Sequence, residues 1–496
     1  MSSAQGLVTL ICVAITATFV LFRRKNILFP PGPSGVPLLG IAHRHPQTEY
    51  WKTYAEWGQV YGTNGVISFH VLGRRIIVLN TAQAATRMLE KNSSIYSDRP
   101  FPTMAGLLMR REKSFFYMKY GERLKMYRKL LHQDIGPIAS QKYWGIQEIE
   151  SRKLALSLLM QEGSEQLERH LRKNAAAVIM RITYGYSIKD FDDQFVAIAE
   201  ESMRVASLAA APGKWLVDAL PFLRFLPSWF PGTGFRRLAE EWGAHMYNQS
   251  LIPHQYVKQQ MVQGTAKPCF TANHLQPPVS DEFDDIVLWT TGALYSGAAD
   301  TTTSTLKSFF FLMCLYPDVQ KRAQEEVDSI IGNDRLPTLA DRPRLSFLDQ
   351  LISEVMRWNP PAPLGLPHSS SQDSRFDGAI THDENIYPDP HVFNPNRFNG
   401  SLGRPQPDPR QWIFGFGRRV CPGMYIAESS IFIQVATILA TLDILRDTDD
   451  IGREIIPEAD FSTAIVSYIK SFPYKLRPRF ETSEILLQSA IASTEL

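Results

Sequence analysis

A ten-residue loop near the C-terminus, residues 414–423, constrains the fold of this 496-residue chain more than any other stretch. Its three glycines permit tight backbone turns where a side chain would be in the way. Pro422 directly follows Cys421 and fixes the chain direction, as expected at the start of a helix. Residues 424–445 are largely apolar and contain no Gly or Pro, which predicts a buried helix. Cys421 is therefore expected in a glycine-rich loop at the N-terminus of a core helix.

The position of Cys421 favours its thiolate, the form that binds metal ions. The helix dipole and the neighbouring Arg418 and Arg419 both stabilise negative charge there. The other three cysteines are widely scattered along the chain: Cys12, Cys269 and Cys314. This scatter argues against a disulfide framework, a zinc cage or an iron–sulfur cluster, and it suits a reducing compartment. What remains is a structural cysteine in a glycine turn, or one thiolate on one iron whose other positions are filled by a porphyrin.

The loop also completes the pattern Phe-x-x-Gly-x-Arg-x-Cys-x-Gly. Its residues are Phe414, Gly417, Arg419, Cys421 and Gly423. This pattern resembles the haem loop of the cytochrome P-450 monooxygenases, and other segments look like the fungal microsomal members of that family. The resemblance implies haem b (iron protoporphyrin IX), with Cys421 as the iron ligand and Gly415 among the haem-binding residues. It also implies a mainly α (α+β) fold, in which a helical haem domain carries a small, partly antiparallel sheet.

A second segment, residues 297–302, lies at the centre of a helical stretch predicted over residues 284–315. Its small residues let another group approach the backbone, and Asp300 and Thr301 add an acid and a hydroxyl suited to proton transfer. Taken alone, the segment also fits close helix packing with a surface Asp. Ahead of the cysteine loop, it resembles the oxygen-binding motif of the family, which implies catalytic roles for Asp300 and Thr301. Ala298 departs from the usual Gly, and its methyl group narrows the expected pocket.

Three positions resemble groups that bind the haem propionates in the family. Residues 121–133 predict a helix rich in basic residues, where family members carry a Trp and, four residues later, an Arg. Here these positions are Leu124 and Arg128, so the guanidinium can still pair with a carboxylate but the indole donor is absent. His368 matches a position that donates to a propionate, and Arg419 is the third group expected to neutralise these carboxylates.

Glu354 and Arg357 carry opposite charges at positions i and i+3 of a predicted helix. An exposed pair of this kind contributes little to stability. The pair resembles the buried Glu-x-x-Arg of the family, which a later Arg completes, and Arg397 supplies that residue here. The implied role is structural, because the three side chains hold the haem loop from behind.

The N-terminus has the pattern of a membrane anchor. Residues 6–22 are uncharged and would span about 25 Å as a helix, close to the ~30 Å hydrocarbon core. The basic cluster at residues 23–25 follows the run instead of preceding it, unlike a cleaved signal peptide, and keeps the body cytoplasmic. A single-pass protein of the endoplasmic reticulum membrane is implied. We predict a lumenal N-terminus (1–5), a transmembrane signal anchor (6–22), a basic and Pro-rich linker (23–36), a haem-thiolate domain (37–480) and a C-terminal tail without an assignable role (481–496).

Other segments are predicted to surround the haem. Residues 66–72 and 74–79 are apolar, β-branched runs on either side of a glycine and predict a hairpin. Residues 81–92 predict a helix with Thr81 as its cap. Residues 96–120 contain several Pro, Gly, aromatic and Met residues and cannot form one helix. By resemblance they form a loop over the distal haem face that touches substrate; the alternative is an ordinary surface loop.

Some features remain open or point to a defect. Residues 220–232 are apolar and broken by Pro, which suits either contact with a membrane surface or buried packing. Residues 463–467 resemble the tip of a late hairpin that reaches the substrate pocket. Between Gly378 and Ala379 the chain lacks a hairpin that family members carry, and such a hairpin needs about 12–14 residues. The fold is therefore expected to be incomplete near 378–379, with backbone groups of neighbouring strands left unpaired.

The resemblance implies insertion of one oxygen atom from O2 into an organic substrate, with Cys421 donating electron density that favours O–O cleavage. Electrons are expected from NADPH through a membrane-bound cytochrome P-450 reductase, with cytochrome b5 as a second candidate donor. The pocket segments are apolar, which suits a secondary metabolite, fatty acid or xenobiotic.

Composition adds one exclusion, and three alternatives stay open. Lys plus Arg number 52 against 50 Asp plus Glu, so nothing indicates nucleic-acid binding. The first alternative is a haem protein that rearranges peroxides or dehydrates its substrate without a reductase. The second is a ligand-binding protein without turnover, and the third is a haem-poor, non-functional splice or gene-model variant.

Overall fold

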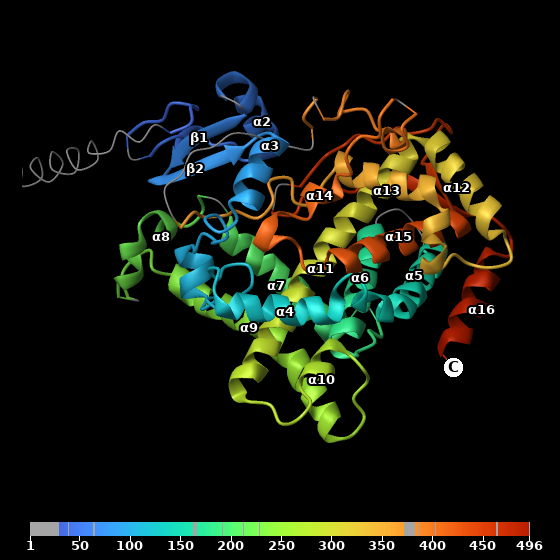
Figure 1. The fold of residues 1–496 in the computed structure, drawn as a ribbon, viewed down its shortest axis with the longest axis horizontal. Helices are drawn as coiled ribbons and strands as arrows, with labels where there is room; N and C mark the ends of the chain where they lie inside the picture. The colour runs from blue at the N-terminus through green and yellow to red at the C-terminus, as the bar shows by residue number, and fades with distance from the viewer. Residues whose placement is uncertain are drawn as a thin grey trace, which may run out of the picture.

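Helix α11 (Asp281–Leu315) runs through the middle of the molecule and contacts most of the other long helices (Figure 1). Three acidic residues in its first turn complement the helix dipole, and the Ser280 side chain accepts a hydrogen bond from the Phe283 amide. The helix ends before Tyr316, and Pro317 begins the next helix. The helix predicted over residues 284–315 is confirmed, with its start at Asp281.

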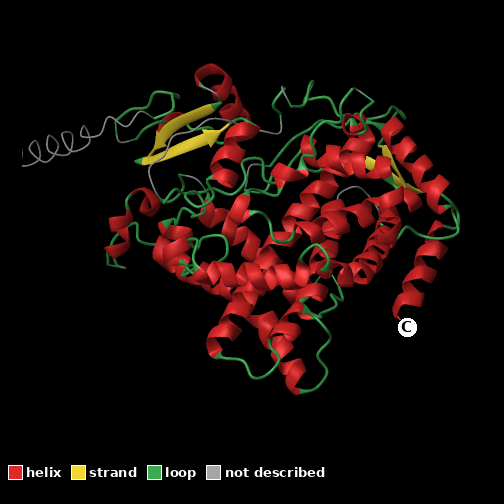
Figure 2. Cartoon of the chain, viewed as in Figure 1, coloured by secondary structure: helices red, strands yellow, loops and turns green. Residues whose placement is uncertain are grey.

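Helices dominate the rest of the chain, and strands are few (Figure 2). This computed structural model describes residues 29–37, 39–62, 65–161, 166–190, 192–211, 213–227, 229–371, 382–384, 386–401, 403–462 and 465–495. Its other α-helices are α2 (Tyr50–Tyr61), α3 (Ala82–Ala85), α4 (Glu122–Ile135), α5 (Trp144–Leu159), α6 (Leu167–Tyr184), α7 (Gln194–Ala210), α8 (Leu216–Ala219), α9 (Phe235–Val262), α10 (Phe270–His274), α12 (Pro317–Ile331), α13 (Ser346–Trp358), α14 (Arg410–Ile413), α15 (Met424–Thr441) and α16 (Ser483–Glu495).

Two small antiparallel sheets complete the described fold. The predicted hairpin is confirmed as β1 (Val66–Val71) and β2 (Arg74–Leu79). A second pair joins β3 (Leu442–Arg446) to β4 (Tyr474–Pro478). The predicted mainly α (α+β) fold with a small sheet is therefore confirmed.

The predicted helix over residues 424–445 is wrong in its last turn, because α15 ends at Thr441 and the next residues form β3. Their backbone groups pair with a strand about thirty residues further on. The Gln320 side chain of α12 also bonds both backbone groups of Ile444, at 2.8 and 2.9 Å. These long-range partners override the helical pattern.

Two local predictions have different outcomes: the first is confirmed in part, and the second is confirmed. Residues 81–92 do form helical turns, as α3 followed by the π-helical turn η2 (Thr86–Lys91), but the Thr81 side chain makes no capping hydrogen bond. Within residues 96–120 the structure has only one short helical element, η3 (Thr103–Leu108). The prediction that this segment cannot be a single helix is confirmed.

The main hydrophobic core lies between α12, α13, α15 and the second half of α11. Phe309–Met313 of α11 are fully buried in it. The C-terminal tail packs as α16 against α5, with Leu487 buried beside Ala155 and Leu336. In contrast, the apolar residues 220–232 are not buried, since Phe222, Phe225 and Trp229 are 60%, 74% and 79% exposed. The buried-packing alternative for that segment is therefore wrong.

Several predictions fall outside the described residues. They are the lumenal residues 1–5, the anchor 6–22, residues 23–28 of the linker, the break at 378–379 and residues 463–464 of the hairpin tip. Within the described residues, α15 alone is long and apolar enough to cross a membrane. Because 72% of that helix is buried inside the molecule, it is a core helix.

Candidate active site

The cysteine loop makes a tight turn that presses against η2. Gly415 and Gly417 have φ angles of +81° and +51°, a region that favours glycine. A Cβ atom at Gly417 would lie 2.5 Å from the carbonyl oxygen of Leu89. The Cys421 amide donates to the Phe414 carbonyl at 2.7 Å, which closes the loop. Phe414, Gly415 and Gly417 thus hold Cys421 just before α15, as predicted.

The electrostatic surroundings of Cys421 differ in part from the prediction. Burial raises the pKa of the thiol, while the Gly423 amide and the Arg128 guanidinium act to lower it. The two arginines of the loop are engaged elsewhere: Arg418 stacks over the Tyr120 ring at 4.7 Å, and Arg419 donates to backbone carbonyls. Arg128 of α4, distant in sequence, is therefore the cation that favours the thiolate.

The predicted haem-facing cations converge in space. Arg419, only 4% exposed, donates to the carbonyls of Ser97 and Met118, both at 2.6 Å. Arg128 donates to the Val420 carbonyl at 2.9 Å, next to Cys421. Burial lowers the pKa of Arg419 to about 10. Attraction to Asp98 opposes this shift, and repulsion from Arg128 adds to it.

His368 and a residue that the sequence reasoning missed, Arg99, complete this group. His368 Nδ1 lies 2.6 Å from the Tyr96 carbonyl oxygen, and burial with repulsion from Arg99 lowers its pKa to about 4. Arg99 donates to the carbonyls of Leu366 and Pro367, both at 2.7 Å. Burial and repulsion from Arg419 lower the pKa of Arg99 to about 9, and its Nε atom has no partner. The sequence gives no signal for this role, because Arg99 is one of five basic residues in the 96–120 segment.

These buried cations require an anion. Among the described residues no carboxylate forms an ion pair with the buried Arg99 and Arg419 or with the half-buried Arg128, although Asp98 lies near enough to interact with Arg419. Burial of charge without such a partner is strongly unfavourable. Cys421 is also partly exposed, as are residues 296–299 and Thr301 near the middle of α11. The arrangement fits a flat group that takes a thiolate on one face and carries carboxylates at its edge, as haem does.

At the centre of α11, Asp300 and Thr301 face different partners. The Asp300 side chain is 6% exposed and forms an ion pair with Arg172 of α6. The Arg172 guanidinium also lies 5.2 Å from the centroid of the Tyr468 ring. Thr301 is partly exposed, and its Oγ1 donates to the Gly297 carbonyl at 3.0 Å. Asp300 and Thr301 are thus neighbours in α11, and Arg172 of α6 binds the Asp300 carboxylate.

Glu354, Arg357 and Arg397 form a buried network, so the exposed-pair alternative is wrong. Arg357 donates twice to Glu354, at 2.7 and 2.8 Å, and both side chains are 0% exposed. Arg397 donates to the same carboxylate at 3.2 Å. The remaining guanidinium donors bond backbone carbonyls at Pro388, Asp389, Pro390 and Val392. The network joins α13 to η8 (Pro395–Phe398).

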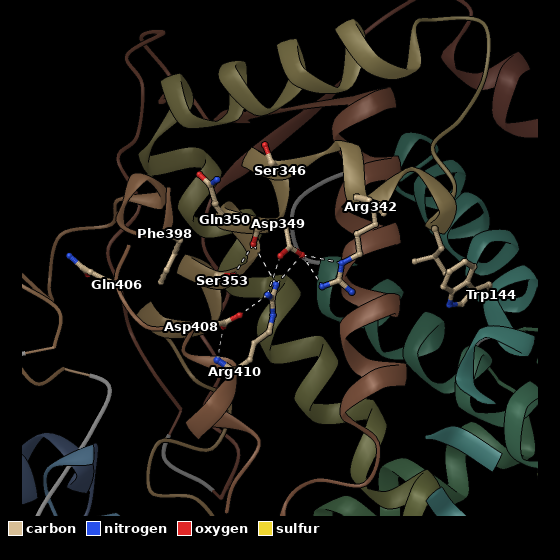
Figure 3. Close-up of a pocket in the computed structure, with 12 residues that line it drawn as sticks. Trp144, Arg342, Ser346, Asp349, Gln350, Ser353, Phe398, Gln406, Asp408 and Arg410 are labelled. Atoms are coloured by element: carbon tan, nitrogen blue, oxygen red, sulfur yellow. Dashed lines mark hydrogen bonds and ion pairs between the residues drawn. The ribbon is translucent and has the colours of Figure 1, made fainter. Parts of the chain in front are cut away.

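A pocket behind the cysteine loop is lined by α13, η7 (Leu339–Arg344) and the segment that leads into the loop (Figure 3). At its centre Asp349 accepts hydrogen bonds from Arg342 at 2.8 Å and from Arg410 at 3.1 Å. Burial raises the pKa of Asp349, but the two arginines together lower it below its ordinary value. Because Arg410 begins α14, this network fixes the start of the loop to α13.

The family model for cytochrome P450 matches residues 30–468, most of the chain and every residue placed above. The chain belongs to the cytochrome P450 family. It is 37% identical over 492 residues to cytochrome P450 monooxygenase 208 of Postia placenta, covering 95% of each chain. It is 38% identical over 482 residues to cytochrome P450 monooxygenase claR of Ampulloclitocybe clavipes, covering 94% of this chain and 89% of the relative.

Membership of this family settles the general chemistry. The relatives are fungal cytochrome P450 monooxygenases, so this P450 is an oxidoreductase of the monooxygenase type. Family members use haem, iron protoporphyrin IX, and the cations and thiolate described above fit that group. A redox partner, O2 and a small-molecule substrate follow from the same family.

Proposed function

We propose that this P450 inserts one oxygen atom from O2 into a lipophilic organic substrate, with electrons from NADPH through cytochrome P-450 reductase. The observation that carries the proposal is the partly exposed Cys421 beside Arg128 and near the buried Arg99 and Arg419, none of which forms an ion pair with a carboxylate of the described residues. Bound haem supplies the iron that activates oxygen. Cys421 would bind its iron through the sulfur, and Phe414, Gly415 and Gly423 would shape the loop around that cysteine. Arg99, Arg128, His368 and Arg419 bind the propionates.

Asp300 and Thr301 deliver protons in this proposal. Thr301 is partly exposed, like residues 296–299 of the same helix, so its hydroxyl can hold a proton toward the reacting centre. Asp300 is the acid next to it in the helix, and the ion pair with Arg172 orients its carboxylate. The pair distinguishes an oxygen-activating enzyme from a reductase-independent isomerase or dehydratase.

The reductase is proposed to dock on the side of α4 and the cysteine loop. Lys125, Lys129 and Arg418 are exposed there and would meet an acidic partner surface, which mainly raises the association rate. Cytochrome b5 is a second candidate donor for the same surface. Lys125 also pairs with Glu122, so part of this basic face is a solvated ion pair.

Membrane attachment is proposed through the anchor at residues 6–22, with the catalytic domain on the cytoplasmic side of the endoplasmic reticulum. The exposed aromatic residues Phe222, Phe225 and Trp229 support a second contact with the membrane surface. Aromatic side chains with this exposure are unusual on a face that meets only water.

Two spectroscopic and kinetic measurements test the proposal. The reduced, carbon-monoxide-treated protein is expected to show the haem–thiolate Soret band, and added reductase is expected to consume NADPH when substrate is present. Absence of haem uptake would point to the haem-poor variant expected from the break at 378–379. A normal band without NADPH consumption would point to a ligand-binding protein or to a reductase-independent enzyme.

Thr301→Ala is expected to uncouple NADPH consumption from product formation, because it removes the hydroxyl on the open face of α11. Product formed per NADPH should fall by about tenfold or more, with the difference released as peroxide or water. The control is Thr303→Ala, since Thr303 makes the same bond to the carbonyl four residues earlier, at 2.8 Å, but is fully buried. Equal coupling in both variants would remove Thr301 from the proton path.

Arg172→Gln is expected to lower product formation without loss of haem, because it leaves the buried Asp300 carboxylate without its cation. Removing the partner of a buried charge costs about 1–3 kcal/mol or more, so the variant should be less stable, and Asp300→Asn in the same chain should restore part of that stability. Arg169→Gln, one turn earlier on α6 and 54% exposed, is the control. If both Arg variants keep the wild-type pH–rate profile, Arg172 has no role in positioning the acid.

A further inference from the structure

Arg111 is the one buried basic side chain of the described residues that has no hydrogen-bonding or ionic partner there. It is 7% exposed, and its guanidinium carbon lies 4.9 Å from the centroid of the Tyr117 ring. Burial lowers its pKa. The other buried Lys and Arg side chains all donate to carboxylates or carbonyls: Arg99, Lys307, Arg357, Arg397 and Arg419.

An arginine in this state is incomplete without an anion. A guanidinium has five N–H donors, and burial without acceptors costs several kcal/mol. Contact with one aromatic face contributes only about 0.5–2 kcal/mol and accepts none of those donors in the plane of the group. Because the neighbouring Arg110, Glu112 and Lys113 are exposed, the segment could have placed Arg111 in water at little cost, yet it faces inward.

No carboxylate of the described residues forms an ion pair with Arg111. Asp285, the carboxylate linked to this segment, already pairs with Lys113 and Arg123. Glu112 is exposed. The haem propionates belong to the separate group around Arg99 and Arg419, and no interaction couples Arg111 to either of those arginines.

The segment that carries Arg111 passes next to the partly exposed stretch of α11, residues 296–299. The pairs His254–Asp284 and Ser296–Gln249 show that α9 runs antiparallel to α11, so earlier residues of α9 lie toward the α11 centre. Those earlier residues share one apolar cluster with the Arg111 segment: Met104, Met109, Tyr117, Trp242 and Met246. In addition, Phe116 lies 3.8 Å from the place of a Cβ atom on Gly297. Phe116 therefore lies next to the partly exposed stretch of α11, while Met109, on the other side of Arg111, packs against α9.

We propose that the substrate of this P450 is a lipophilic carboxylic acid, and that Arg111 binds its carboxylate. The fork of the guanidinium matches a carboxylate with two parallel hydrogen bonds. The surrounding Met, Trp and Phe side chains suit a hydrocarbon body that extends toward α11. This inference rests on the proposed monooxygenase function and narrows its substrate class from lipophilic compounds in general to acids.

Calorimetric titration of the haem-loaded, full-length protein tests the inference. The probes are dodecanoic acid, hexadecanoic acid and abietic acid, each paired with its methyl ester, which keeps the hydrocarbon body and removes the charge. At least one acid is expected to bind about 10- to 100-fold more tightly than its ester, the range for a charge-assisted hydrogen bond. If no acid binds better than its ester, the inference is overturned.

Variants assign the preference to Arg111. Arg111→Gln should bind acid and ester alike, and Arg111→Lys should recover part of the preference. Arg110→Gln is the matched control, because Arg110 is the adjacent arginine and is exposed. Retention of the acid preference in Arg111→Gln, or its equal loss in Arg110→Gln, would overturn the assignment. If Arg111→Gln does not fold, the Lys variant and the acid–ester ratio of the wild type decide.

The readouts separate failure of this inference from failure of the proposed function. Heat of binding reports carboxylate recognition whether or not oxygen is activated, and the carbon monoxide spectrum of the same sample reports the haem–thiolate site. A normal spectrum with NADPH-dependent oxidation of neutral compounds only would overturn the acid assignment and leave the monooxygenase function intact. Selective acid binding without NADPH-dependent product, despite a normal spectrum, would overturn the substrate assignment together with the monooxygenase function.

Discussion

Replacing Cys421 with alanine is expected to abolish the haem–thiolate absorption of this P450 and all NADPH-dependent product formation. Cys421 is the one cysteine of the described residues that lies in the glycine loop, next to the buried cations that fit the haem carboxylates. Of the other cysteines that the structure describes, Cys269 and Cys314 are buried elsewhere, so neither can supply a thiolate in its place. The reduced carbon monoxide spectrum measures the change directly, and residual haem should absorb like a protein without a thiolate ligand.

The matched control is Cys314→Ala. Cys314 is buried in the main core, where burial raises the pKa of its thiol to about 12, so it is a poor ligand. The control therefore removes one sulfur and leaves a small cavity while the loop stays intact. A haem–thiolate band that survives in Cys421→Ala, or that disappears equally in Cys314→Ala, would rule out Cys421 as the axial ligand.

The cysteine loop could be predicted from the sequence because its determinants are local. Gly415 and Gly417 adopt positive φ angles, and the amide of Cys421 bonds a carbonyl seven residues away. The same holds for the β1–β2 hairpin, whose strands meet across a single glycine-containing turn. Tight turns of this kind require particular residues, glycine above all, and these residues can be recognised in the sequence.

Features that depend on contacts between distant parts of the chain could not be predicted in this way. Arg172 meets Asp300 across 128 residues, and residues 442–445 form part of β3 instead of the predicted helix because their partner strand lies far along the chain. Arg99 and Arg111 are ordinary basic residues in the sequence and become informative only once their burial is known. Whether an arginine is buried depends on which helices cover it, and no local pattern records that.

Glu354 allows a direct test of how burial changes the contribution of an ion pair to the free energy of unfolding. Arg357 donates to it at 2.7 and 2.8 Å across an i, i+3 spacing, and both side chains are 0% exposed. The exposed pair Glu201–Arg204 on α7 has the same spacing and the same two-bond geometry, at 2.7 and 2.6 Å. Its side chains are 35% and 56% exposed, so the two pairs differ mainly in burial.

Glu354→Gln is expected to destabilise the protein by about 3–5 kcal/mol, because it leaves Arg357 and Arg397 buried without an anion while keeping the side-chain size. That loss is a large fraction of the 5–15 kcal/mol that typically separates folded from unfolded protein, so the variant should also retain haem poorly. Glu201→Gln should leave the urea midpoint nearly unchanged, since water solvates Arg204 when its partner is removed. Urea unfolding followed by circular dichroism and by haem absorbance measures both effects. Equal midpoint shifts in the two variants would mean that the buried network does not hold the structure behind the haem loop.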